Sequence, residues 1–256
     1  MPPRIKKIGF IILLIALWEA FAWSSPKYIQ YFPPLSIITR SFFNAATSTE
    51  VFSQVLITLS RIFRGYALGI LFGVSLGSTA GKLKLFYYAI EPAIELVRPL
   101  PSVVLVPIAI LVFGVDDTMN IAMIAYASTW PIFINTLEGV RGVDVMYENT
   151  GRVFGLGRLG LIRKVIIPAA LPFIVTGLRI GLGVAVIAVI SSEMIASSKG
   201  LGVFLIESSQ TDHIPETYGA LLIIGLVGYA LNQGFRALEG HFMAWHKGAS
   251  FQEEVL

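Results

Sequence analysis

Apolar residues in this chain gather into long runs, and charges, glycines and prolines concentrate in the short segments between them. A helix needs roughly 20 consecutive apolar residues to cross the hydrocarbon core of a bilayer. The pattern therefore predicts an all-α integral membrane protein with six transmembrane helices. The predicted spans are 8–24, 56–80, 86–113, 119–137, 172–196 and 217–238.

Composition supports a membrane protein. Hydrophobic residues make up 55% of the 256 residues and charged residues only 14%, whereas about 25% is typical of a soluble domain. The net charge of +3 is spread over the loops, which argues against nucleic acid as a partner. The chain has no cysteine, and its histidines, His213, His241 and His246, have no partner at ligand spacing, so no metal centre is predicted.

The first apolar run is either a cleaved signal peptide or a retained anchor. Trp18, Glu19 and Trp23 replace the small residues of a cleavage site, which favours the anchor. We therefore expect an anchor helix with an outer linker or elbow over 1–55. A core membrane domain follows over 56–240, and residues 241–256 form a short tail.

Lysine and arginine collect near the cytoplasmic ends of spans, and their distribution here predicts that both termini are cytoplasmic. The same orientation places the loop over about 138–171 in the cytoplasm. Arg61 and Arg64 fall on the outer side, where we expect them to extend to the interface or lie on an elbow. Asp116 and Asp117 fall in an outer loop, where solvated carboxylates are ordinary.

Glycines recur at every fourth position of the second span and lie on one helical stripe, which predicts a close helix–helix contact. The partner helix belongs either to the same chain or to a second copy. The stripe consists of Gly65, Gly69, Gly73, Gly77 and Gly81.

The third span contains prolines that remove backbone donors which lipid cannot replace, and this predicts a broken helix beside a cavity. These prolines are Pro92, Pro99, Pro101 and Pro107.

Arg98 lies beside this break, and an intramembrane charge is a functional-site hypothesis. We predict that the translocation path includes Arg98, the adjacent Pro99 and Pro101, and Glu193 of the fifth span. The alternative is that Arg98 pairs with Glu91, Glu95 or Glu193, or lies nearer the surface. For Glu193, a structural ion pair is favoured over a gate.

Two motifs resemble nucleotide sites without meeting their requirements. Gly155, Gly157 and Gly160 spell GxGxxG, but no strand is predicted before them. The GSTAGK segment at Gly77–Lys82 has too few residues between its glycines and no Ser or Thr after its lysine. We therefore predict that the chain is not an enzyme and holds no cofactor of its own.

The loop after the fourth span has two amphipathic stretches, Tyr147–Phe154 and Leu159–Ile167, which are separated by glycines. It resembles the EAA loop of bacterial ABC importer permeases, whose pattern is EAA, three residues, Gly, nine residues and I-x-LP. Gly155 takes the glycine place and Val165 the isoleucine place. Asn149-Thr150-Gly151 stands where EAA is usual, with Glu148 one residue earlier.

The resemblance extends over nearly the whole chain. The stretches ELVRPLPSVVLVPIAILVFGVDDTMNIA, TGLRIGLGVAVIAVISSEMI, SKGLG and AWHKG are similar to the permease branch that imports taurine, alkanesulfonates, nitrate and bicarbonate. The resemblance implies the type I importer fold, a second permease copy, two cytoplasmic ATPases that hold ATP and Mg, and an outer solute-binding protein. It also implies a bacterial inner membrane location.

In such a permease the loop couples ATPase closure to the membrane helices. Val153, Phe154 and Leu156 would fill a groove of the ATPase, and Arg152 and Arg158 would meet acidic residues at its rim. The coupling residues implied by the resemblance are Glu148, Asn149, Thr150, Gly151, Arg152, Val153, Phe154, Gly155, Leu156, Arg158 and Pro168.

The expected solute is taurine or a related sulfonate, with nitrate, bicarbonate or another small solute as alternatives within the branch. A different class, an ion-coupled secondary transporter, would use intramembrane carboxylates. The six runs show no clear inverted repeat and few intramembrane acids, which disfavours that class.

Overall fold

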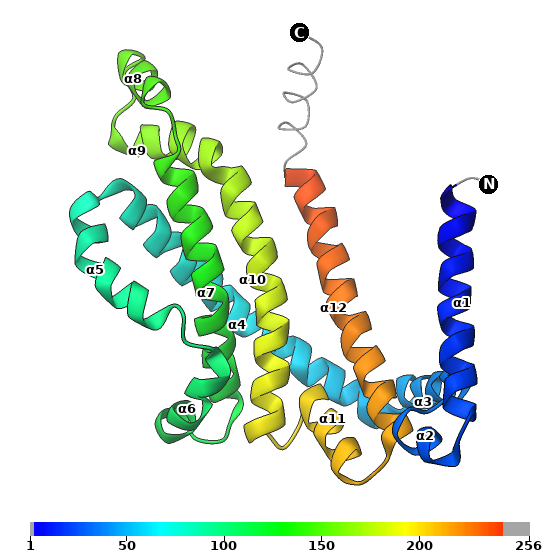
Figure 1. Ribbon diagram of the computed structural model, residues 1–256. Helices are drawn as coiled ribbons and strands as arrows, with labels where there is room; N and C mark the ends of the chain where they lie inside the picture. Colours follow the sequence, from blue (N-terminus) through cyan, green and yellow to red (C-terminus); the bar gives the residue numbers. More distant parts are fainter. Residues whose placement is uncertain (1–2, 243–256) are drawn as a thin grey trace. The chain divides into compact units, whose positions relative to one another are not determined.

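The computed structural model describes residues 3–242, which are almost entirely helical and include no strand (Figure 1). Most of the predicted tail lies outside the described residues. In chain order the elements are α1 (Pro3–Trp23), α2 (Pro26–Tyr31), α3 (Leu35–Ala46), α4 (Thr49–Lys82), α5 (Lys84–Val97), the 3₁₀ helix η1 (Ser102–Leu105), α6 (Val106–Phe113), α7 (Asp117–Arg141), α8 (Val145–Val153), α9 (Arg158–Leu161), the π-helix η2 (Ile162–Ile166), α10 (Ile167–Ala196), α11 (Leu201–Gln210) and α12 (Ile214–Phe242).

The chain forms two compact units. One contains the segment that ends at Thr58 together with residues 198–227, and the other contains residues 59–197 together with the segment that begins at Gly228.

In the first unit, Glu19 of α1 holds the start of α3. Its carboxylate accepts hydrogen bonds from the Leu35 amide at 2.7 Å and from the Ser36 hydroxyl at 2.7 Å. Trp18 donates its indole N–H to the Pro33 carbonyl at 3.1 Å. A carboxylate at the first turn of a helix satisfies amides that have no partner within the helix. The polar residues of this apolar helix therefore fix the chain reversal that follows it.

In the second unit, the glycine stripe of α4 packs against α7 of the same chain. A Cβ built on Gly65 would lie 2.6 Å from Ile124 Cβ, and one built on Gly73 would lie 2.7 Å from Ile132 Cβ. The contacts continue to Gly81, where a Cβ would lie 2.7 Å from Val140 Cγ1. Only glycine permits this approach of the two helices from Gly65 to Gly81.

α10 packs on α7 through glycines as well. A Cβ built on Gly177 would lie 2.8 Å from Asn135 Cβ, and one on Gly181 would lie 2.9 Å from Ile132 Cγ1. Around Ile132, a fully buried cluster includes Ile62 of α4 and Val189 of α10. α7 thus packs against both α4 and α10 through these glycines.

By length and composition, three described helices can cross a membrane: α4, the stretch Arg158–Ala196 that includes α10, and α12 up to Gly240. The pair formed by α5 and η1–α6 qualifies together as a fourth. The described apolar part of α1, Gly9–Trp23, is shorter. These helices therefore support up to four of the six predicted spans.

α7 covers the predicted fourth span, 119–137, but is absent from this set of apolar helices within residues 3–242. Its buried residues include Asn120, Ser128 and Thr136, and it packs against helices on two faces. A helix surrounded by protein does not have to present an apolar surface to lipid. Hydropathy alone therefore gives an incomplete description of this element.

The predicted third span is broken, as its prolines indicate. α5 ends at Val97, η1 and α6 follow from Ser102, and the two parts are bent by 86°. The break contains Pro99 and Pro101, which have no N–H to continue α5. Arg98 therefore lies in the short segment between the two helical parts.

Candidate functional site

The loop between α7 and α10 folds into a short helix, a tight turn and a second helical stretch. Asp144 caps α8, because its side chain accepts a hydrogen bond from the Met146 amide at 2.8 Å. Gly155 adopts φ +77°, a conformation that strains other L-residues. α9 begins after Gly157, and α8 and α9 lie together at one end of α7 and α10 (Figure 1). The two predicted amphipathic stretches therefore correspond to α8 and to α9 with η2.

One face of this loop is anchored to the membrane helices. Gly151 is buried, and a Cβ on it would lie 2.6 Å from Leu161 Cδ2. Leu156 packs against a cluster that includes Val140 and Leu161. Leu156, which we expected to insert into a partner, is half-buried against this cluster. Glu148 forms an ion pair with Lys82 of α4.

The other face is apolar and open to solvent. Val153 is 86% exposed and Phe154 is 81% exposed. Val145, Met146 and Tyr147 are exposed as well. These five residues form what we call the α8 apolar surface.

The remaining predicted loop residues surround this surface. Asn149, Thr150, Arg152 and Arg158 are exposed, and Pro168 is half-buried in the first turn of α10. A groove of about 740 Å³ separates α8 from the start of α10, and Tyr147, Phe154 and Pro168 are among the residues that line it.

Arg98 lies exposed at the break between α5 and η1. Within residues 3–242 it forms no ion pair with Glu91, Glu95 or Glu193, so the paired alternative for Arg98 is wrong. Glu91 instead accepts a hydrogen bond from Tyr87 at 2.6 Å.

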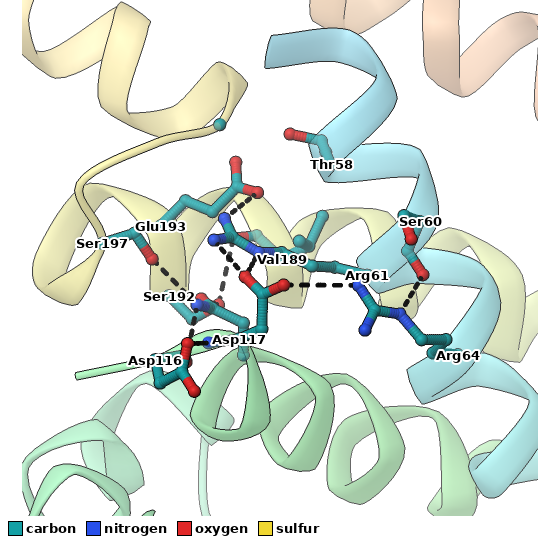
Figure 2. A network of polar contacts seen from close by, with 12 residues as sticks. Thr58, Ser60, Arg61, Arg64, Asp116, Asp117, Val189, Ser192, Glu193 and Ser197 are labelled. Atoms are coloured by element: carbon teal, nitrogen blue, oxygen red, sulfur yellow. Dashed lines mark hydrogen bonds and ion pairs between the residues drawn. The ribbon is translucent and has the colours of Figure 1, made fainter. Parts of the chain in front are cut away.

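A second polar cluster lies at the start of α7, at the opposite end of this helix from α8. The Arg61 guanidinium of α4 is 2.6 Å from Asp117 Oδ1 and 2.8 Å from Glu193 Oε1 of α10. Arg64 contacts the other Asp117 oxygen at 3.3 Å. We call these four residues the Arg61 network; Figure 2 shows them with their neighbours. The network joins α4, α7 and α10.

Neutral groups extend the network. Asn120 of α7 accepts a hydrogen bond from the Ser192 hydroxyl at 2.8 Å and donates to the Ser197 hydroxyl at 2.8 Å. Asp116 caps α7 by accepting from the Asp117 amide at 2.7 Å. Each carboxylate in this region therefore has a polar partner.

Two expectations about these residues are wrong. Arg61 is only 5% exposed and does not extend to the interface. Asp117 is the first residue of α7 and bridges two arginines, so it is not a solvated loop residue. Glu193 is 1% exposed and has an ion-pair partner. The four-residue spacing of Arg61 from Gly65 places Arg61 on the face that meets α7, which was the available sequence signal.

Asp117 lies outside the predicted span 119–137. Partial burial raises the pKa of its carboxyl, but the hydrogen bonds and charges of Arg61 and Arg64 outweigh burial and hold the pKa below its ordinary value. The carboxylate therefore stays ionised and paired near neutral pH.

Comparison with known proteins agrees with this arrangement. Residues 69–242 match the family described as binding-protein-dependent transport system inner membrane component. The chain is 32% identical over 250 residues to a bicarbonate transport system permease protein of Synechocystis, covering 93% of this chain and 87% of the relative. It is 32% identical over 233 residues to a nitrate import permease protein of Leptolyngbya laminosa, covering 88% and 82%. Permeases named for aliphatic sulfonates and for taurine are also relatives.

A solved amino acid ABC transporter chain aligns with a TM-score of 0.57 at 23% identity, covering 81% of this chain and 96% of that chain. At this identity the likeness shows the fold. The fold is therefore that of an ABC importer permease. The chain belongs to the binding-protein-dependent transport system inner membrane components, the multi-pass permease subunits of ABC importers, whose ATPase activity lies in separate subunits.

Proposed function

We propose that this permease imports a small solute with a sulfonate group, such as taurine, which an outer binding protein delivers. Relatives named for aliphatic sulfonates and taurine support this solute class. Relatives named for bicarbonate and nitrate make those anions the alternatives. Two copies of this chain would form the path, two cytoplasmic ATPases would hold ATP and Mg, and both termini would face the cytoplasm.

The observation that carries the coupling proposal is the α8 apolar surface. A contiguous apolar surface beside exposed cations is a signature of a protein–protein contact. Val153 and Phe154 project from the turn between α8 and α9 and are among the most exposed apolar side chains of the described chain. In the proposal they insert into a groove of the ATPase, while Arg152 and Arg158 contact acidic residues at its edge.

The inward contacts of the same loop make it suitable as a lever. Gly151 and Leu156 pack against Leu161, and Glu148 is paired with Lys82 at the end of α4. A displacement of α8 by the ATPase would therefore reach α4, α7 and α10 through packed side chains. Rigid-body movement of helices at an interface is a common form of such switching.

We place the translocation path along the break in the third span. Arg98, Pro99 and Pro101 lie on this break, and Arg98 is exposed there. Glu193 lies in the Arg61 network. In this proposal it holds α10 against α4 and does not contact the solute.

The test is to purify the chain with its cognate ATPase subunits in lipid and to measure ATP hydrolysis with and without the cognate binding protein. Taurine-loaded binding protein should stimulate hydrolysis. Stimulation only by nitrate or bicarbonate would reject the sulfonate assignment and leave the coupling proposal standing. Failure of any ATPase to bind the permease would reject the coupling role of α8.

A further inference from the structure

A hollow of about 500 Å³ lies beside the break in the third span. Its lining comes from the break, from the middle of α7 and from α10. The walls are mostly apolar and aromatic, and the lining includes no acidic side chain. Its polar side chains include Arg98, Ser102 and Ser191. Sites for small molecules commonly combine apolar walls with a few convergent polar groups.

Tyr126 of α7 gives the hollow a defined shape. Its hydroxyl donates to the Val97 carbonyl at 2.6 Å and lies 3.3 Å from the Leu100 carbonyl, so it bonds the backbone on both sides of Arg98. Its ring meets the Trp130 ring edge-to-face, with centroids 5.7 Å apart. The Tyr126 side chain therefore contacts both the backbone of the break and the Trp130 ring, which is part of the aromatic wall.

Two groups of this hollow can bind an acceptor. Arg98 carries only donors and has no ion-pair partner within residues 3–242. The indole nitrogen of Trp130 is buried and makes no hydrogen bond of ordinary geometry among the described residues, although its side chain interacts with the Tyr126 hydroxyl. An indole N–H is a donor only, so it can bind an acceptor group of a solute. The charge of Arg98 favours an anion over a cation or a neutral solute.

The walls of the hollow select among anions. Apolar walls such as Ile134 and Ile187 contribute binding free energy only to a solute with a hydrocarbon part.

We propose that this hollow is a binding site for a monovalent organic anion with an apolar body, such as an alkanesulfonate, along the path of the proposed importer. Arg98 binds the anionic group, and Trp130 with the neighbouring apolar residues contacts the body. The indole nitrogen is covered by protein in the empty site, so occupancy must turn the ring or spread the walls for the N–H to find its acceptor. This inference rests on the proposed function and adds a solute site and its selectivity.

The first experiment labels the four tryptophans of the full chain with ¹⁵N and records the indole N–H resonances in lipid nanodiscs. The resonance that is missing in Trp130→Phe is that of Trp130. Butane-1-sulfonate should shift this resonance in a saturable way, and nitrate should require a concentration at least about tenfold higher. No shift, or an equal shift with nitrate and chloride, would overturn the proposal.

Variants then test the roles. Arg98→Gln should weaken butane-1-sulfonate binding roughly tenfold or more, since it removes a charge-assisted contact, whereas Arg98→Lys should retain most of the affinity. Trp130→Phe should weaken binding measured by calorimetry severalfold, and Trp23→Phe, outside the hollow, should leave it unchanged. If Trp130→Phe does not fold, Arg98→Gln decides alone, because an unchanged titration there contradicts the site.

This titration requires neither the ATPase nor the binding protein, so it can fail separately from the proposed function. A flat titration in a chain that still assembles with its ATPase would reject the hollow as a solute site and retain the coupled importer. A saturable titration in a chain that binds no ATPase would support the hollow as a solute site and reject the coupling role of α8.

Discussion

The two ends of α7 handle charge and apolar surface in opposite ways. At its start, the Arg61 network joins three helices of one chain through a buried Arg61–Glu193 contact and a partly exposed Arg61–Asp117 contact. Beyond its end, α8 leaves Val153 and Phe154 in solvent and exposes Arg152 and Arg158. Groups satisfied within the chain stabilise the fold, whereas unsatisfied surface is available to a partner. Substitutions at the first end should therefore affect stability, and substitutions at the second should affect coupling.

The largest effect is expected from Glu193→Ala. It leaves the buried Arg61 guanidinium without one of its carboxylate partners, and breaking a buried ion pair costs about 3–5 kcal/mol. Thermal unfolding of the purified chain in one detergent measures this loss. Glu239→Ala is the matched control, because its ion pair with Arg179 is partly exposed, at 43% for Arg179 and 21% for Glu239, and solvent-accessible pairs contribute at most about 1 kcal/mol. Equal losses of stability in the two variants would show that the Glu193 contact contributes no more to folding than the Arg179–Glu239 ion pair.

Phe154→Asp should leave the stability of the fold almost unchanged and weaken binding of the ATPase. An exposed position tolerates substitution within about 0.5 kcal/mol of unfolding free energy. A central apolar anchor of an interface, in contrast, contributes about 2 kcal/mol or more, roughly a thirtyfold change in ATPase affinity. Phe154→Leu should retain most of the binding. Normal ATPase affinity in Phe154→Asp would contradict the role given to the α8 apolar surface.

Gly155→Leu should uncouple the two subunits with a smaller effect on their assembly. A side chain at Gly155 has open space around it but must adopt φ +77°, which costs roughly 1–2 kcal/mol and shifts the turn between α8 and α9. Stimulation of ATP hydrolysis by the loaded binding protein is the measurement. Gly157→Leu is the control, because Gly157 also has open space and its φ is −67°. Normal stimulation in the Gly155 variant would argue against the lever.

The smallest effect concerns pH. The folded pKa of Asp117 lies below its unfolded value, so its contribution to stability is present above the unfolded pKa and is lost as pH falls through the folded one. Unfolding temperature should therefore fall below about pH 4 more steeply in the wild type than in Asp117→Asn. Because Asp117 is partly exposed, the difference should not exceed about 1 kcal/mol. Parallel pH profiles would mean that the Asp117 contacts are energetically neutral.

Sequence reasoning predicted local features of the helices best where residue spacing or residue type was distinctive. The glycine stripe predicted a close contact, and its five positions meet α7 at successive turns. The prolines around Arg98 predicted the break between α5 and η1. In both cases the residue type itself limits the backbone, so the inference did not need the rest of the fold.

Sequence reasoning failed where the outcome depended on residues far apart in the chain. Asp117 and Arg61 are 56 positions apart, and Arg61 and Glu193 are 132 positions apart. Nothing local marks Asp117 as an ion-pair partner, so it was assigned to a solvated loop. The inward contact of Leu156 is a different case, because it depends on the positive φ of Gly155 in the turn just before it.

The sequence by itself determined that the chain is a helical membrane protein with close helix contacts and a broken span, because apolar run length, glycine spacing and proline position act locally, and its resemblance to ABC importer permeases indicated the family. Only the tertiary structure decided which charges neutralise one another, which loop residues face the protein, and that Arg98, Tyr126 and Trp130 meet beside one hollow. These features depend on the docking of α4, α5, α7 and α10, and close packing between distant segments is specified by all of their side chains together.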